Sequence, residues 1–326
     1  MNAPLLQTKL LPPPPRPDAV PRPHLLARLT AGAAGKLTLV AAPAGFGKTT
    51  LVREWLAHTA VPAAWLSLDE ADNDPVRFWR YAIAALQTAA PAAGAAAADL
   101  LRTPQPPPPH AVLPLLLNDL LALSRRTCLV LDDYHLIAHP AVHDSLAFFI
   151  DQLPPTLHLV ITSRANLPFP VARWRARQQL TELRAADLRF SAAETAVLYH
   201  PFDLAPADLA ALAQRTEGWI AGLQLAALAL RHTPAAARAP FIHAFGGSHA
   251  YVLDYLMEEV LAQQPADVRA FLQHTALLGR LSAPLCAAVT GRTPADSANM
   301  LAQLVDANLF LLPLDAERRW YRYHRL

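Results

Sequence analysis

The sequence predicts an α/β domain, with a parallel sheet and helices on both faces, followed by a helical domain and a winged-helix domain. Three observations lead to this prediction. Strand-like and helix-like segments alternate as far as Phe190, only helical spacing follows to about residue 244, and the last segments combine helices with a hairpin pattern. Alternating strands and helices are typical of a parallel sheet. We expect the three domains at residues 1–190, 191–248 and 249–326.

The first strand leads into a glycine-containing turn. Residues 36–42 (KLTLVAA) form an apolar run, and the segment KTTLVREWLAHT from Lys48 has helical spacing. A strand, a glycine turn and a helix in this order are the context of a phosphate-binding loop. Gly45 and Gly47 lack Cβ atoms, so the backbone can turn its N–H groups toward an anion. The start of the following helix adds free N–H donors and a positive dipole end.

This loop predicts contacts with nucleotide phosphates. Lys48 would reach the β- and γ-phosphate oxygens, and Thr49 would offer its hydroxyl to Mg²⁺. The strict pattern for such loops has glycine at position 42, where this chain has the small residue Ala42. The nucleotide-binding residues expected here are Pro43, Ala44, Gly45, Phe46, Gly47, Lys48, Thr49 and Thr50.

A second strand ends in two acids. In TCLVLDDYH, four apolar residues precede Asp132 and Asp133. In P-loop ATPases the first carboxylate orients Mg²⁺, and the second is placed to polarise an attacking water as general base. The strand LHLVITSR, residues 157–164, ends in Arg164. This arginine either reads a γ-phosphate or lies in a solvated loop.

The remaining segments of the first domain follow the same alternation. Asp74 followed by Pro75 predicts the start of a long helix, and the prolines of 11–17 predict an extended arm in polyproline II geometry. A second proline-rich segment, 103–110, reads as a surface excursion between helices. The other expected elements are strand 63–69, helices 111–124 and 141–151, and a fifth strand at 178–190.

The pattern changes after residue 190. Ser191 with Glu194 three residues later is a capping-box signature for a helix start. FGGS, residues 245–248, reads as a hinge. Helices are expected at 249–263, 265–278, 282–290 and 294–307, followed by a hairpin ending in YRYH. The helix placed to read DNA, PADSANMLAQLVDANL, has no lysine or arginine, so we expect a winged helix that faces protein.

Composition limits the possible classes of function. The net charge of +2 provides no strong basic field for nucleic acid. Cys128 and Cys286 do not form a disulfide framework. No secretory h-region and no apolar tract of about 18 residues appear, so we expect a cytoplasmic protein without membrane contact. Three histidines spaced by four, at 135, 139 and 143, suggest a metal face, but Pro140 interrupts the run.

These motifs together resemble the STAND family of signal-transduction ATPases, and within it the MalT-like (LuxR-type, large ATP-binding) transcription activators. The resemblance spans nearly the whole chain. It rests on the motifs TKLLPP, VPRPHLLARL, APAGFGKTTL, WLSLDEADNDPVRFWRY, LVLDDYHLI, LVITSR, LRAADLRFS, EGWIAGLQLAAL and YRYH. It implies a nucleotide-binding oligomerisation module and a fragment of a longer protein, whose inducer-binding sensor and DNA-binding domain are absent from this chain.

The resemblance also implies roles for individual residues. Asp132 would bind the metal with Thr49, Asp133 would act on the hydrolytic water, and Arg164 matches the sensor arginine. His324 matches the winged-helix histidine that touches the β-phosphate of ADP. Val20 to Arg22 lie where the family's chain flanks adenine. Gln224 replaces the proline of the family's Gly-x-Pro motif, so a nucleotide contact there is not carried over.

The implied activity is a nucleotide-dependent switch. ADP holds a closed resting state, ATP with an inducer favours opening and self-association, and ATP is slowly hydrolysed to ADP and phosphate. Two other readings stay open. One is an AAA+-like motor or loader with an arginine finger among Arg173, Arg175 and Arg177. The other is a scaffold that binds nucleotide without turnover.

Overall fold

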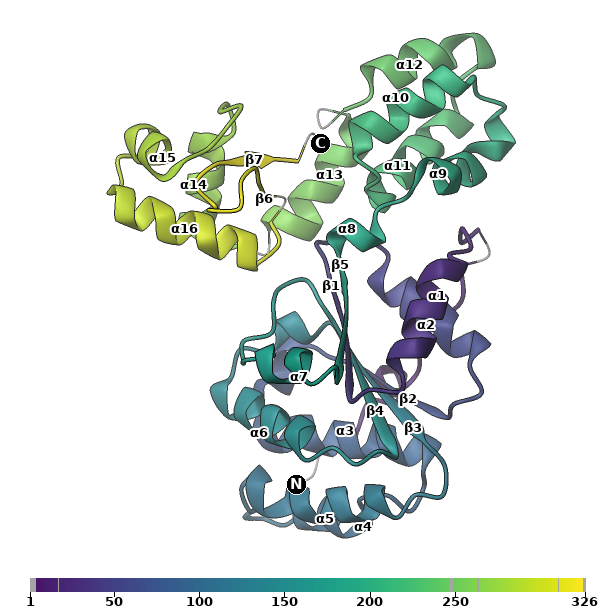
Figure 1. Ribbon diagram of the computed structural model, residues 1–326, viewed down its shortest axis with the longest axis vertical. Coiled ribbons are helices and arrows are strands. Elements are labelled where there is room, and N and C mark those ends of the chain that lie inside the picture. Colours follow the sequence, from purple (N-terminus) through teal and green to yellow (C-terminus); the bar gives the residue numbers. More distant parts are fainter. Residues whose placement is uncertain (1–3, 17, 247–248, 263, 310, 325–326) are drawn as a thin grey trace. The chain divides into compact units, whose positions relative to one another are not determined.

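The computed structural model describes residues 4–16, 18–246, 249–262, 264–309 and 311–324 (Figure 1). The chain folds into two compact units. The first contains residues 1–41 and 48–184, and the second contains residues 42–47 and 185–326. The short loop 42–47 therefore groups with the second unit, although its sequence neighbours belong to the first. The division into three domains at 190 and 248 stays a prediction.

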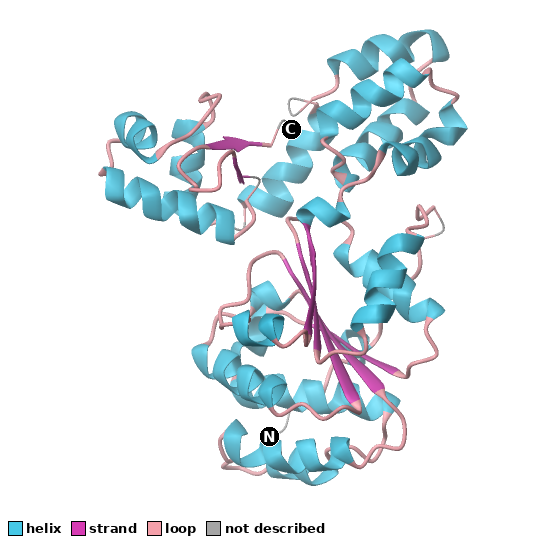
Figure 2. Ribbon diagram, viewed as in Figure 1, coloured by secondary structure: helices cyan, strands magenta, loops and turns pink. Residues whose placement is uncertain are grey.

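A five-stranded parallel sheet forms the centre of the first unit, as predicted (Figure 2). Its order is β2-β3-β4-β1-β5. The strands are β1 (Leu37–Ala41), β2 (Ala63–Ser67), β3 (Thr127–Asp132), β4 (Leu157–Ser163) and β5 (Leu180–Arg184). Every residue of β1, β3 and β4 is buried. Because β4 lies between β1 and β3, the carboxyl ends of these three strands meet at one edge, where parallel α/β sheets bind ligands.

The fifth strand is shorter than the predicted segment 178–190. It ends at Arg184, and the next residues form helix α8 (Ala185–Leu188). The sequence LTELRAADL contains the strand and the helix without a glycine or proline between them, so its composition gives no signal for the end of the strand. This part of the prediction was wrong in extent, although the strand exists and pairs in parallel with β1.

Helices cover both faces of the sheet. On one face, α1 (Pro23–Gly32) and α2 (Lys48–His58) pack, and the Trp55 ring of α2 meets the His158 ring of β4 edge to face. On the other face, Leu37 and Leu39 join a core cluster with residues of α3 (Pro75–Ala89) and α6 (Pro140–Asp151). The remaining helices of this unit are α4 (Ala95–Leu100), α5 (Pro109–Leu121) and α7 (Ala172–Ala176).

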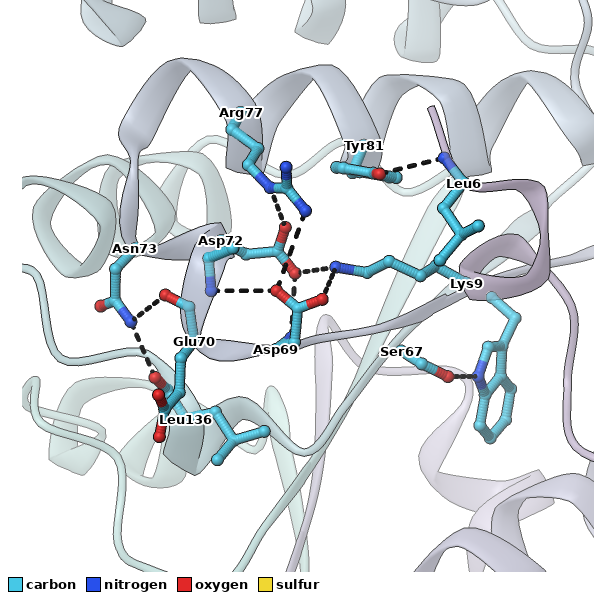
Figure 3. A network of polar contacts seen from close by, with 12 residues as sticks. Leu6, Lys9, Ser67, Asp69, Glu70, Asp72, Asn73, Arg77, Tyr81 and Leu136 are labelled. Carbon is cyan, nitrogen blue, oxygen red and sulfur yellow. Dashed lines mark hydrogen bonds and ion pairs between the residues drawn. The ribbon is translucent and has the colours of Figure 1, made fainter. Parts of the chain in front are cut away.

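The N-terminal arm is anchored by an ion-pair network around the buried Asp72 (Figure 3). A short 3₁₀ turn, η1 (Gln7–Leu10), carries Lys9, whose Nζ pairs with Asp69 at 2.9 Å and also with Asp72. Asp72 is fully buried and also accepts a hydrogen bond from Nε of Arg77 at 3.1 Å. Residues 11–16 carry no helix or strand, which agrees with an extended arm. The sequence reading missed the anchor, because Lys9 and its acids lie far apart in the chain.

Replacing Lys9 by alanine is expected to lower the free energy of unfolding by about 3 kcal/mol, because removing one partner of a buried pair leaves a charge without full compensation. Urea unfolding measures this. Arg102→Ala is the control, since its pair with Asp99 is mostly exposed and should cost less than about 1 kcal/mol. Equal losses in the two variants would contradict the anchoring role of Lys9.

The second unit is helical and ends in a small winged helix. The capping box predicted at Ser191 and Glu194 is present at the start of α9. Of the predicted hinge FGGS, Gly247 and Ser248 lie outside the described residues. After α8, the helices of this unit are α9 (Ala192–Tyr199), α10 (Pro206–Thr216), α11 (Ile220–Arg231), α12 (Arg238–Ala244), α13 (Ala250–Leu256) with a π-helical turn η6 (Met257–Leu261), α14 (Ala266–Thr275), α15 (Ala283–Thr290) and α16 (Pro294–Asp306).

The predicted hairpin closes the winged helix. Strands β6 (Leu311–Pro313) and β7 (Tyr321–Tyr323) pair antiparallel. Together with α14, α15 and α16 they enclose a separate apolar core that includes Phe271, Leu304 and Tyr321. Both cysteines are buried free thiols. Across the described part of the chain, no helix combines the length and apolar character that a membrane span requires.

Candidate functional site

A buried carboxylate lies at the carboxyl edge of the sheet. Asp132, the last residue of β3, accepts a hydrogen bond from the Thr162 hydroxyl of β4 at 2.5 Å. It also accepts one from the Thr49 hydroxyl of α2, at 3.0 Å to Oδ1 and 3.2 Å to Oδ2. Burial, and then the charge of neighbouring Asp133, raise the pKa of Asp132 to about 6. A nearby cation would favour the charged form of this buried carboxylate.

Asp133 differs from its neighbour in both backbone and exposure. Its backbone is left-handed, with φ 59° and ψ 42°, a conformation that is uncommon for residues other than glycine and is found at functional sites. The Asp133 N–H donates to the Thr162 hydroxyl at 2.9 Å, which holds this turn. The carboxylate is 41% exposed. It can therefore meet solvent, whereas the Asp132 carboxylate is bound by protein hydroxyls.

Lys48 and Arg164 bring positive charge to the same edge. Lys48 begins α2 and is 7% exposed. Burial lowers its pKa to about 8; Asp133 opposes this shift and Arg164 adds to it, so all three side chains lie close enough to interact. The structure therefore brings together five residues that the sequence predicted for the site: Lys48, Thr49, Asp132, Asp133 and Arg164.

His135 was missed as a member of this group. Its Nδ1 lies 3.8 Å from Oδ1 of Asp133. Burial, then the charges of Arg164 and Lys48, lower the pKa of His135 to about 3, so the ring is neutral at pH 7. Its position two residues after the acid pair in DDYH was the available signal.

The three histidines do not form a metal face. His135 lies at the sheet edge, His139 caps the start of α6, and His143 is hydrogen-bonded through Nδ1 to the Tyr134 hydroxyl at 2.8 Å. Among the residues that the structure describes, no group of three His, Cys, Asp or Glu side chains could hold a metal ion.

The loop 42–47, for which the sequence predicts phosphate binding, is hydrogen-bonded to residues at the start of helix α11 in the second unit. The Trp219 indole N–H donates to the Ala44 carbonyl at 3.0 Å, and the Ala221 N–H donates to the Gly45 carbonyl at 2.9 Å. Gly45 has φ 77°, and a Cβ there would lie 2.5 Å from the Cβ of Ala221. Glycine is therefore required by both conformation and space. Gly47 has φ 72° and completes the turn before α2.

His324 lies near this loop in the same unit. Its Nε2 is 3.9 Å from Oε2 of Glu217, and its ring meets the Trp219 ring edge to face with centroids 6.3 Å apart. Trp219 in turn bonds to Ala44. Burial lowers the pKa of His324 to about 4, so it is neutral at pH 7. Sequence reasoning missed Trp219 and Glu217, although both lie in the motif EGWIAGLQLAAL.

Three other residues predicted to contact the nucleotide, Val20, Arg22 and Thr50, lie on separate segments of the chain. Val20 and Arg22 are buried just before α1, at 8% and 5% exposure. Thr50 lies in α2 and is half-buried. Gln224, for which no nucleotide contact is carried over, lies in α11.

The candidate arginine fingers are engaged within the first unit. Arg173 pairs with Asp151, and Nε of Arg175 pairs with Glu182 at 2.6 Å. These ion pairs account for two of the three positions.

Comparison with known proteins agrees with this architecture. Residues 257–326 match the family model of the MalT winged helix domain. The chain is 35% identical over 328 residues to the HTH-type transcriptional regulator MalT of Cronobacter sakazakii, covering 99% of this chain and 36% of that protein. It is 32% identical to MalT of Vibrio cholerae, covering 95% of this chain and 34% of that protein.

A solved structure shows the same fold. The Walker-type ATPase PABY2304 of Pyrococcus abyssi superposes with a TM-score of 0.65 at 14% identity, covering 98% of this chain and 97% of that one. The fold is that of a P-loop ATPase module with a winged-helix domain. By sequence the chain is similar to these MalT regulators over nearly its whole length, and it spans about a third of their length.

Proposed function

We propose that this chain is the nucleotide-dependent switch of a MalT-like transcription activator. ADP stabilises a closed resting form, and ATP with an inducer favours an open form that self-associates. One observation carries the proposal: the phosphate-binding loop is hydrogen-bonded by Trp219, whose ring also meets the ring of His324 on the winged helix. Trp219 therefore contacts both the loop that would bind phosphate and the distant His324.

The acid pair supports slow ATP hydrolysis. Thr49 and Asp132 would hold Mg²⁺, since both present oxygen atoms, the ligands that this cation prefers. The ion would supply positive charge to the phosphates. Asp133, which is exposed and next to the neutral His135, would accept a proton from the attacking water. Lys48 and Arg164 would bind the phosphate oxygens, and Val20 to Arg22 would flank the base.

The remaining functions of the whole protein are part of the same proposal. We place inducer recognition and DNA binding in segments outside this chain, and the protein in the cytoplasm. Helix α16 has no lysine or arginine, so this winged helix would contact protein surfaces and not DNA. A ligand shifts a two-state equilibrium only by its difference in affinity for the two states, so the switch requires different affinities for ADP and ATP in each form.

Identifying the nucleotide released from purified, denatured protein tests this function. A switch that rests with ADP is expected to retain ADP in one-to-one amount through purification. A motor or loader would release it between cycles, and a scaffold without turnover would fail a single-turnover assay with ATP. Absence of any bound or bindable nucleotide would exclude the proposal.

Replacing His324 by alanine is expected to weaken ADP binding by about one to two orders of magnitude. A hydrogen bond to a charged phosphate oxygen contributes about 1.5–3 kcal/mol, and we propose that His324 donates one to the β-phosphate. ATP binding should fall less, because the open form does not make this contact. Titration calorimetry with both nucleotides measures the ratio. An equal loss for both, or no loss for either, means that His324 is not the latch.

A further inference from the structure

The turn between α10 and α11 has an unusual backbone. Glu217 and Gly218 both adopt left-handed conformations, with φ 47° and 71°. Gly218 needs to be glycine, because a Cβ there would lie 2.6 Å from the Phe190 carbonyl oxygen. Glu217 has no such requirement, and a residue with a Cβ atom is disfavoured in this region. A side chain kept at a disfavoured backbone position suggests that the side chain itself has a role.

The Glu217 carboxylate binds the end of the winged helix. Its two oxygens accept hydrogen bonds from both terminal nitrogens of Arg322, at 2.6 Å and 3.0 Å. Arg189 donates to the same carboxylate at 3.2 Å, and Nε2 of His324 lies 3.9 Å away. Glu217 is only 9% exposed. Two-pronged arginine–carboxylate pairs are directional and stronger than neutral hydrogen bonds.

The same turn also holds the phosphate-binding loop. Trp219, two residues after Glu217, donates its indole N–H to Ala44. The Gly218 carbonyl accepts the Phe190 N–H at 2.8 Å, which fixes the turn from another side. Residues 217–219 thus contact the loop through Trp219 and strand β7 through Glu217. Movement of β7 away from the turn requires the Arg322 pair to break.

We propose that Glu217 is the positioning residue for His324: through Arg322 it holds the end of β7 beside the phosphate-binding loop, and so makes the affinity of the closed form for ADP depend on this ion pair. The inference rests on the proposed nucleotide switch. Arg322 and His324 are two residues apart and both lie against the same carboxylate. Without that carboxylate, the ring of His324 loses its fixed position next to Trp219.

Titration calorimetry on Glu217→Gln tests this proposal. The substitution keeps the side-chain shape and removes the charge. ADP affinity is expected to fall about tenfold, the scale of one charge-assisted hydrogen bond, and ATP affinity by less than about threefold. Asp208→Asn is the matched control: Asp208 lies on α10 and pairs with the exposed His243, and this change should leave both affinities unaltered.

Three further measurements keep the outcome decisive. Glu217→Gly also removes the carboxylate but suits the left-handed backbone, so it serves if the glutamine variant does not fold. Combining Glu217→Gln with Arg322→Met should add little to the loss of ADP affinity, because both remove one interaction. Hydrogen exchange at Tyr321 to Tyr323 should rise in ADP-bound Glu217→Gln relative to the parent protein.

Each result separates this inference from the proposed function. If the parent protein binds neither ADP nor ATP, the proposed function itself fails. If it binds ADP, but both Glu217 variants keep the parent ratio of ADP to ATP affinity, only the positioning role is overturned. Additive losses in the double variant would also overturn it, since Glu217 would then act independently of Arg322.

Discussion

Replacing Lys48 by alanine is expected to abolish binding of both ADP and ATP while the fold survives. Lys48 is the only lysine in the phosphate-binding segment and begins α2 directly after the glycine turn. Its ammonium group lies close to Asp132 and Asp133, so it is held where phosphate oxygens would arrive. Without this ammonium group, the negative charges of Asp132 and Asp133 would repel the phosphates and oppose nucleotide binding.

The fold is expected to survive because Asp132 can take up a proton. Its pKa is already raised to about 6 by burial and by Asp133, so loss of the ammonium group shifts it further toward the neutral form. Circular dichroism and thermal unfolding check the fold, and calorimetry checks binding. Lys36→Ala is the matched control, because Lys36 precedes the opposite end of β1 and donates to the Asp151 carbonyl. Unchanged nucleotide affinity in Lys48→Ala would refute the site.

Replacing Asp133 by asparagine is expected to slow ATP hydrolysis by about 10²-fold or more, the usual scale for loss of a general base, while ATP still binds. Asparagine has nearly the same shape and adopts the left-handed backbone readily. The N–H donated to Thr162 belongs to the backbone and is retained. The change therefore removes the proton acceptor and little else. Single-turnover hydrolysis at saturating ATP measures the chemical step apart from nucleotide exchange.

The neighbouring acid provides the comparison. Asp132→Asn removes the carboxylate that is bonded to Thr49, so it should weaken the response to Mg²⁺ concentration, whereas Asp133→Asn should not. If Asp132→Asn stops turnover and Asp133→Asn leaves the rate intact, the general base is a different residue. His135 is then the next residue to test, since its ring is neutral and lies 3.8 Å from Asp133.

Local sequence patterns were sufficient for most of the fold. Apolar runs and helical spacing predicted the strands of the sheet and the helices of the second unit, and the capping box at Ser191 was found where expected. The loop Gly45–Gly47, the following Lys48 and the acid pair were also recognisable, because each needs particular residue types at neighbouring positions. The least certain elements were those without a stop signal, such as the end of β5 at Arg184.

Contacts between distant segments were decided only by the tertiary structure. Thr49 and Asp132 are 83 positions apart, and Trp219 and Ala44 are 175 apart. No periodicity relates such positions, since spacing encodes which face of an element a side chain occupies and not which other element packs there. The hydrogen bond from Thr162 to Asp132, the ion pair of Lys9 with Asp72 and the ion pair of Glu217 with Arg322 are examples. Each depends on how separate elements pack against one another in the folded chain.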